Sequence, residues 1–218
     1  MGGRGSFSES NERPEGSSGN SKQKWTGNVA QPIPPSGHLR EAIGTKGKPF
    51  KPSDALVHVN PNYDPRTSEF SENCQRCVVA YELRRRGYDV TALPTYDGDT
   101  MGRHAYGLNH RYQMAFRHAR VENVGANNPD RVQRNVESRL LSWGNGSRAI
   151  VSIPGHVFNA ENRNGKIIYV DAQTGIRYTS NRTFGRINRG GLRSVSVMRT
   201  DNLRISDRAR ELVTLRRR

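Results

Sequence analysis

Cysteine and apolar residues are both scarce in this 218-residue sequence. Its two cysteines lie three positions apart, and such a pair excludes the disulfide framework of a small secreted domain. Apolar residues make up 33%, below the about 45–50% of an average globular protein counted with glycine, so we expect part of the chain to be unpacked. We see no apolar run long enough to span a bilayer and no Sec signal peptide at the start.

Acidic residues are also few, because 20 Asp and Glu stand against 35 Lys and Arg, for a net charge of +15. Such a charge suits contact with nucleic acid, acidic proteins or an anionic surface. The arginines are spread along the chain, which favours a solvated basic surface. No helix-turn-helix, RNA-recognition or zinc-finger pattern accompanies them.

Composition divides the chain into two parts. Residues 1–50 are rich in Gly, Ser, Asn, Pro and charge and have no sustained period of 2 or 3.6, which predicts a disordered or linker tail. Residues 51–218 are long enough for one domain of ordinary size.

Period and turn signals predict short strands and helices in this domain. We expect strands at 55–59, 88–93, 148–153 and 195–199, and helices at 112–119, 130–143 and 207–215. Residues 95–110 read as a long polar loop. The histidines in or just beyond it lack ligand spacing and are expected on the surface or in packing; they are His104, His110 and His118.

The first informative stretch is a helix predicted between Asn73 and Gly87. Asn73 is a good N-cap, Cys74 then takes the first helical position, and Gly87 suits the position after the end. A helix N-terminus favours thiolate and offers N–H groups to an oxyanion. The same residues also fit a buried helix in which Cys74 and Cys77 are small core residues.

The second informative stretch is a hairpin predicted over residues 155–175, in which two β-prone runs flank Asn164-Gly165. In one register His156 faces Asp171, and in the other it faces Gln173. Both registers keep the three side chains on one face. A carboxylate or amide beside a histidine fixes its tautomer and orients it as a base. An ordinary hairpin with polar ends is the other interpretation.

A thiol at a helix N-terminus, followed by His and then Asp, is the arrangement of papain-like enzymes. The blocks that carry it here resemble the papain-fold toxin domains of bacterial polymorphic toxins, often called toxin glutamine deamidases. The resemblance covers about residues 60–202. It implies an α+β, papain-like fold with the N-terminal catalytic helix packed on a small antiparallel sheet. The blocks are Asn73-Cys74-x-x-Cys77, Gly155-His156-Val157-Phe158-Asn159 and Tyr169-Val170-Asp171-Ala172-Gln173-Thr174-Gly175.

The same resemblance implies an activity and a role for each residue. It implies a hydrolase that attacks a glutamine carboxamide of a target protein through a thioester and needs no metal or organic cofactor. Cys74 is then the nucleophile, His156 the base and Asp171 its orienting partner. Asn73 and Gln173 are supporting groups, and Cys77 is the second choice of nucleophile.

Partners and location follow from the same resemblance. The partner is a protein bearing a reactive glutamine, and an immunity protein is a further candidate. We expect delivery by a specialised route to the cytoplasm of a target cell.

Three alternatives stay open. A cysteine protease or transglutaminase on the same fold shares every residue named, although Ser68 stands where papain-type proteases place a glutamine. A basic nucleic-acid-binding or phage-type structural protein without catalysis fits the charge, through non-specific contacts. A zinc site at Cys74 and Cys77 with a histidine is the third, but the order of ligands differs from that of zinc deaminases.

Overall fold

Six antiparallel strands form the main sheet, in the order β2-β7-β3-β4-β5-β6, and β1 and β8 pair separately. The structure is a computed structural model that describes residues 39–95, 111–178, 182–185 and 189–216. The strands are β1 (Val90–Ala92), β2 (Glu122–Asn123), β3 (Arg148–Ile153), β4 (His156–Arg163), β5 (Lys166–Asp171), β6 (Ile176–Tyr178), β7 (Ser196–Arg199) and β8 (Val213–Leu215).

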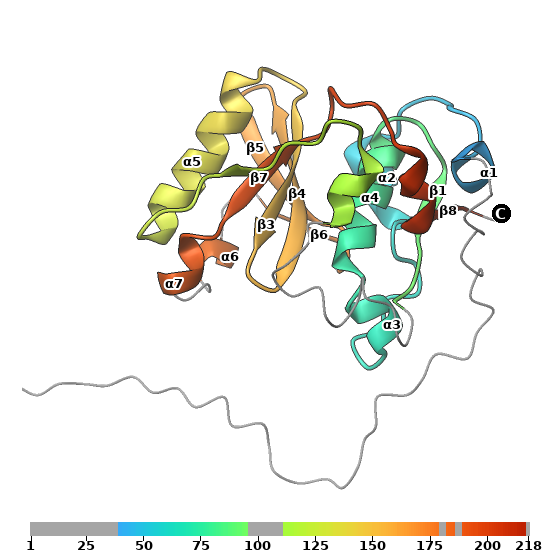
Figure 1. Cartoon of the computed structure of the whole chain (residues 1–218), viewed down its shortest axis with the longest axis horizontal. Coiled ribbons are helices and arrows are strands. Elements are labelled where there is room, and N and C mark those ends of the chain that lie inside the picture. Colours follow the sequence, from blue (N-terminus) through green and yellow to red (C-terminus); the bar gives the residue numbers. More distant parts are fainter. Residues whose placement is uncertain (1–38, 96–110, 179–181, 186–188, 217–218) are drawn as a thin grey trace, which may run out of the picture.

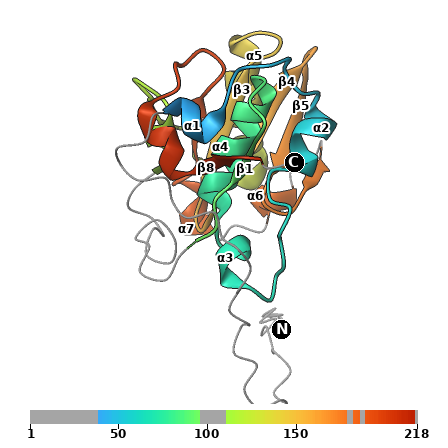
Figure 2. The ribbon, with the colours of Figure 1, turned by 90° about the vertical axis from the view of Figure 1, so that its right-hand side faces the viewer.

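Helices cover both faces of the main sheet (Figures 1 and 2). α4 contacts β4 on one face, and α5 contacts β3, β4 and β5 on the other. The α-helices are α1 (Leu39–Ile43), α2 (Pro52–Val57), α3 (Ser68–Ser71), α4 (Cys74–Arg85), α5 (Pro129–Ser142), α6 (Arg182–Gly185) and α7 (Arg189–Leu192). Two 3-10 helices are η1 (Arg111–Ala115) and η2 (Asp207–Glu211).

The two faces of the sheet have separate apolar cores, because successive strand residues point to opposite sides. Ile150, Val157 and Val170 join the core beneath α4. Their neighbours Val151 and Phe158 join the core beneath α5. The molecule is therefore a three-layer α+β fold, with α4 on one face of an antiparallel sheet.

α4 has the predicted bounds. It runs without Pro or Gly from Cys74, and Gly87 beyond its end has a φ of +103°. A Cβ at Gly87 would lie 2.3 Å from the carbonyl oxygen of Gly47, so the position requires glycine for two reasons. The predicted capping by Asn73 is wrong. Its side chain bonds Asn60, Leu93 and Gln173 rather than the first turn of α4.

The hairpin has the second of the two predicted registers. β4 and β5 are joined through Asn164 and Gly165, both with positive φ, and Asn159 pairs with Val170. Asp171 is therefore diagonal to His156 rather than directly opposite it.

Other predictions are confirmed in outline. The helix predicted at 130–143 is α5, and the Asn128 side chain accepts from the N–H of Arg131 at its start. The strands predicted at 88–93, 148–153 and 195–199 are β1, β3 and β7. His118 is exposed, as expected of a surface residue. His104, His110 and most of the loop predicted at 95–110 lie outside the described residues.

Three assignments need correction. Residues 55–59 are not a strand but mostly the helix α2, which starts with Pro52 at a position suited to proline. Residues 111–115 form the 3-10 turn η1 instead of a helix to 119. Residues 207–215 split into η2 and β8, because β8 supplies the pairing partner that β1 needs.

Part of the segment predicted as a tail, residues 1–50, is folded. Residues 1–38 lie outside the described part of the chain. Residues 39–50 include α1, whose Ala42 and Ile43 are buried in the core beneath α4. Among the described residues, no helix has the length and apolar character needed to cross a membrane.

Candidate active site

His156 and Asp171 face each other at one end of the hairpin. Nε2 of His156 lies 3.1 Å from Oδ2 of Asp171, and both side chains are mostly buried. Gly155, with a φ of +77°, reverses the chain between β3 and β4 immediately before His156. The pair therefore sits where β4 begins and β5 ends.

Cys74 completes this group from the opposite layer. It is the first residue of α4, is partly exposed, and its side chain interacts with the His156 imidazole, whose pKa it raises. The structure thus brings together a thiol, an imidazole and a carboxylate from three separate elements. This is the order of contacts expected of a nucleophile, its base and an orienting group.

The electrostatics of His156 favour its protonated form. Burial lowers the pKa of the imidazole, but the hydrogen bonds to Asp171 and Cys74 outweigh it and raise the pKa to about 10. For Asp171, burial raises the pKa of the carboxyl, and the bond to His156 overcomes this and leaves the pKa below its usual value. Near neutral pH the pair is an imidazolium beside a carboxylate.

The turn after β5 holds the Asp171 carboxylate in place. Its Oδ1 accepts from the N–H of Gln173 at 3.1 Å and of Thr174 at 3.4 Å, which leaves Oδ2 directed at His156. Carboxylates held by several donors keep one orientation. The orientation of His156 is therefore determined by the backbone of residues 171–174.

Asn73 ties this turn to the head of α4. Its side chain is buried, donates to the Leu93 carbonyl at 3.2 Å, and accepts from Nε2 of Gln173 at 3.4 Å. Asn60 donates to the Gln173 carbonyl at 3.1 Å and exchanges hydrogen bonds with Asn73 at 3.1 and 3.3 Å. The three amides connect α4 with the turn that carries Asp171.

Cys77 takes part in packing. It is fully buried, and its Sγ donates to Oδ1 of Asn73 at 3.2 Å. Burial raises the pKa of this thiol well above its usual value, which disfavours the nucleophilic thiolate. Of the two cysteines, Cys74 is the one in contact with His156.

All six candidate residues thus lie in one region, and the sequence analysis missed a seventh, Asn60. Its partner Gln173 is 113 positions away, and an asparagine followed by proline is by itself typical of a turn and not of a site. No cluster of three or more His, Cys, Asp or Glu suited to holding a metal ion occurs within the described residues.

Comparison with protein families gives one match. Residues 72–176 match the model of the family described as papain fold toxin 1, glutamine deamidase. This segment is therefore similar to the toxin glutamine deamidase domains of that family. The searches of curated proteins and of solved structures gave no match. The matched segment runs from just before Cys74 to just past the turn that holds Asp171, whereas Asn60 lies outside it.

Proposed function

We propose that this chain is a cysteine-dependent protein-glutamine deamidase toxin in which Cys74, His156 and Asp171 form the catalytic group. The observation that supports it best is His156, which is hydrogen-bonded to Asp171 and interacts with the thiol at the head of α4. The family of the matched segment supplies the reaction class.

The first half of the reaction forms a thioester. His156 already holds the proton as an imidazolium beside the thiolate of Cys74, and the sulfur attacks the carboxamide carbon of a glutamine on the target protein. The resulting oxyanion lies at the first-turn N–H groups of α4. Collapse of the tetrahedral intermediate breaks the C–N bond, and His156 protonates the departing ammonia.

The second half releases the product. His156 removes a proton from water, the hydroxide oxygen attacks the thioester carbon, and the C–S bond breaks. The released thiolate lies beside the His156 imidazolium, which restores the starting pair, and glutamate remains on the target. Asp171 stays ionised throughout and keeps the imidazole oriented. The proposed reaction requires no cofactor. We propose that the toxin acts after delivery into a target cell.

The decisive test compares the proteomes of cells that produce the wild type, Cys74→Ala or Cys77→Ala. We expect Gln-to-Glu changes on one or a few proteins with the wild type and with Cys77→Ala, and none with Cys74→Ala. If the Gln-to-Glu changes are lost with a folded Cys77→Ala variant but not with Cys74→Ala, Cys77 is the nucleophile.

Other outcomes point to other reactions. New peptide termini would indicate a protease, and cross-links between glutamine and amines would indicate a transglutaminase. Identical proteomes for the wild type and Cys74→Ala would contradict the enzymatic proposal.

A further inference from the structure

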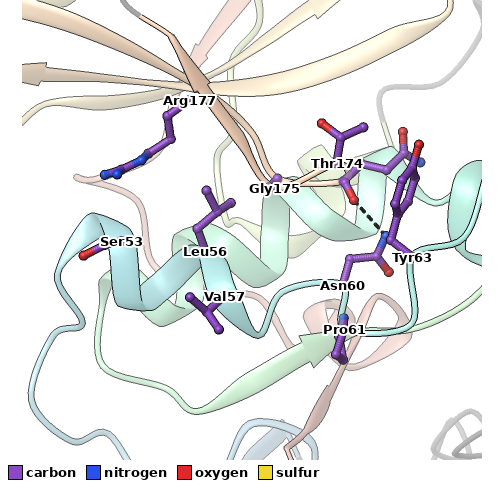
Figure 3. A pocket seen from close by; sticks show the side chains of 11 residues that line it. Ser53, Leu56, Val57, Asn60, Pro61, Tyr63, Thr174, Gly175 and Arg177 are labelled. Atoms are coloured by element: carbon purple, nitrogen blue, oxygen red, sulfur yellow. Dashed lines mark hydrogen bonds between the residues drawn. The ribbon is translucent and has the colours of Figure 1, made fainter.

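A pocket of about 430 Å³ lies between α2 and the turn that follows β5 (Figure 3). Leu56 and Val57 line it from α2, and Thr174 and Gly175 line it from the turn. The proposed reaction uses none of these side chains. The pocket is therefore a separate feature of the molecule.

The pocket nevertheless shares a wall with the proposed active site. Asn60 and Gln173 line it, and both are hydrogen-bonded to Asn73, the residue before Cys74. Thr174 also lines it, and its backbone N–H donates to Asp171. A polypeptide in this pocket is thus held against the same atoms that position the nucleophile and the base.

Apolar side chains are exposed around this pocket. Val57 and Tyr63 line it and are 65% and 38% exposed. These are two of the five large apolar side chains that are exposed in the described part of the chain. Clustered exposed apolar surface is typical of a binding site for another protein.

Arg177 gives the pocket a positive charge. It is exposed, and it is the charged residue among the eleven that line the pocket. Among the described residues, no carboxylate forms an ion pair with Arg177, whereas Arg84, Arg85 and Arg86 at the end of α4 are all paired. An acidic side chain of a partner complements this position.

We propose that this pocket binds the segment of the target protein next to the reactive glutamine, with a bulky apolar side chain on Val57 and Tyr63 and an acidic side chain at Arg177. This inference rests on the proposed deamidase function. An extended segment spans about 3.3–3.6 Å per residue. Recognition at a pocket that adjoins the site therefore selects residues a few positions from the glutamine.

The test uses the full chain and synthetic peptides with a central glutamine. One flanking position carries Phe or Ala, and another carries Glu or Lys. Mass spectrometry and ammonia release give kcat/KM for each peptide. For the wild type we expect kcat/KM for the peptide with Phe and Glu to exceed that for the peptide with Phe and Lys by about threefold to fivefold. This is the size of the effect of an exposed ion pair. We expect Arg177→Glu to reverse this preference and Val57→Asp to remove the preference for Phe.

Arg163→Glu is the matched control, since Arg163 is exposed at the other end of the β4–β5 hairpin and the net charge changes equally. We expect it to keep the wild-type preference. Deamidation by the wild type without any flanking preference overturns the pocket assignment alone. If the Arg177→Glu variant prefers the Glu peptide over the Lys peptide as the wild type does, the pocket assignment is also overturned.

A wild type that converts no peptide in the set overturns the pocket assignment as stated. The proteome comparison with Cys74→Ala then shows separately whether the deamidase proposal also fails.

Discussion

Two polar residues hold the two halves of the proposed site. Asp171 is fixed by two backbone N–H groups and orients His156 from the hairpin side. Asn73 is buried at the head of α4 and binds Gln173 in the same turn. Because both contacts converge on residues 171–174, a loss at either residue moves the base relative to the thiol.

The raised pKa of His156 predicts a pH-dependent contribution to stability. The folded pKa of about 10 exceeds the usual 6.5, so the contribution is complete below about pH 6.5 and is lost as the pH rises toward 10. We expect the stability advantage of the wild type over His156→Gln to fall by about 2 kcal/mol across this range, the size of a hydrogen bond to a charged group.

Urea unfolding at several pH values measures this difference, and NMR titration of the imidazole gives its midpoint. Asp171→Asn is expected to lower the midpoint toward the ordinary histidine value. A stability difference that does not vary with pH would contradict the assigned protonation state.

Asn73→Ala tests the amide network. The substitution removes the Asn73 donor to Oδ1 of Asn60 and the Asn73 acceptor for Nε2 of Gln173, both buried, so we expect a loss of about 2 kcal/mol in the free energy of unfolding. We also expect kcat to fall at least about tenfold, because the turn that bears Asp171 is released from α4.

Asn127→Ala, at an exposed asparagine before α5, is the control and should change stability by less than about 0.5 kcal/mol. Denaturant unfolding gives the stabilities, and ammonia release gives kcat. An Asn73→Ala variant with normal stability and rate would show that the network is dispensable.

At the scale of helices and strands, the sequence predicted the elements with strong local signals. α4 and α5 are uninterrupted helical runs, α5 also has the Asn128 cap, and the hairpin has Asn164-Gly165, so local chemistry alone indicates them. Residues 55–57 look β-prone but are helical, because Pro52 starts a helix whose Ala55 and Leu56 complete the core. Here tertiary packing overrides local preference.

The C-terminal element and the site show the same limit. The stripe of Ala209, Leu212 and Val213 fits a helix, but the last of these pairs with Ala92 in β1. Cys74, His156 and Asp171 were predictable, because the sequence motifs around them and their order along the chain indicate a papain-like site. Asn60 was not, since its role depends on contacts with Asn73 and Gln173, distant in sequence.

The glycines that follow α4 and α5 give a matched pair of substitutions. Gly87 and Gly144 have φ values of +103° and +92°, but a Cβ at Gly87 would lie 2.3 Å from the Gly47 carbonyl oxygen. At Gly144 a Cβ would meet nothing within 4 Å among the described residues. We expect Gly144→Ala to cost about 1 kcal/mol and Gly87→Ala more than about 3 kcal/mol.

Thermal or denaturant unfolding of the two variants measures both costs. If both variants lose the same free energy of unfolding, the backbone around Gly47 can move to accommodate a Cβ at residue 87 without a further loss of stability. In that case the approach of residues 47–50 to the end of α4 would not be tight.

At the scale of the whole molecule, the segment before α2 belongs to the folded domain. Gly47 donates to the Gly87 carbonyl at 2.9 Å, and Phe50 donates to the Arg84 carbonyl at 3.2 Å. The Arg84 guanidinium lies 4.4 Å from the centre of the Phe50 ring. The composition of residues 39–50 resembles a tail, yet these contacts cover the end of α4 opposite to Cys74.

Two truncations separate the tail from the domain. Removal of residues 1–38 keeps every core residue of the described structure, so we expect Tm to change by less than about 2 °C. Removal of residues 1–50 also deletes the buried Ala42 and Ile43 of α1 and the contacts of Phe50 with α4. Burial of one isoleucine side chain alone contributes about 1.5–3 kcal/mol.

We therefore expect the longer truncation to lower Tm by about 8 °C or more, since about 1 kcal/mol shifts Tm by 2–4 °C in a domain of this size. Scanning calorimetry of the two variants beside the full chain measures both shifts. If both truncations unfold together with the full chain, α1 contributes nothing to stability and the domain begins at residue 51. If removal of residues 1–38 already lowers Tm strongly, the folded domain extends further toward the N-terminus than α1.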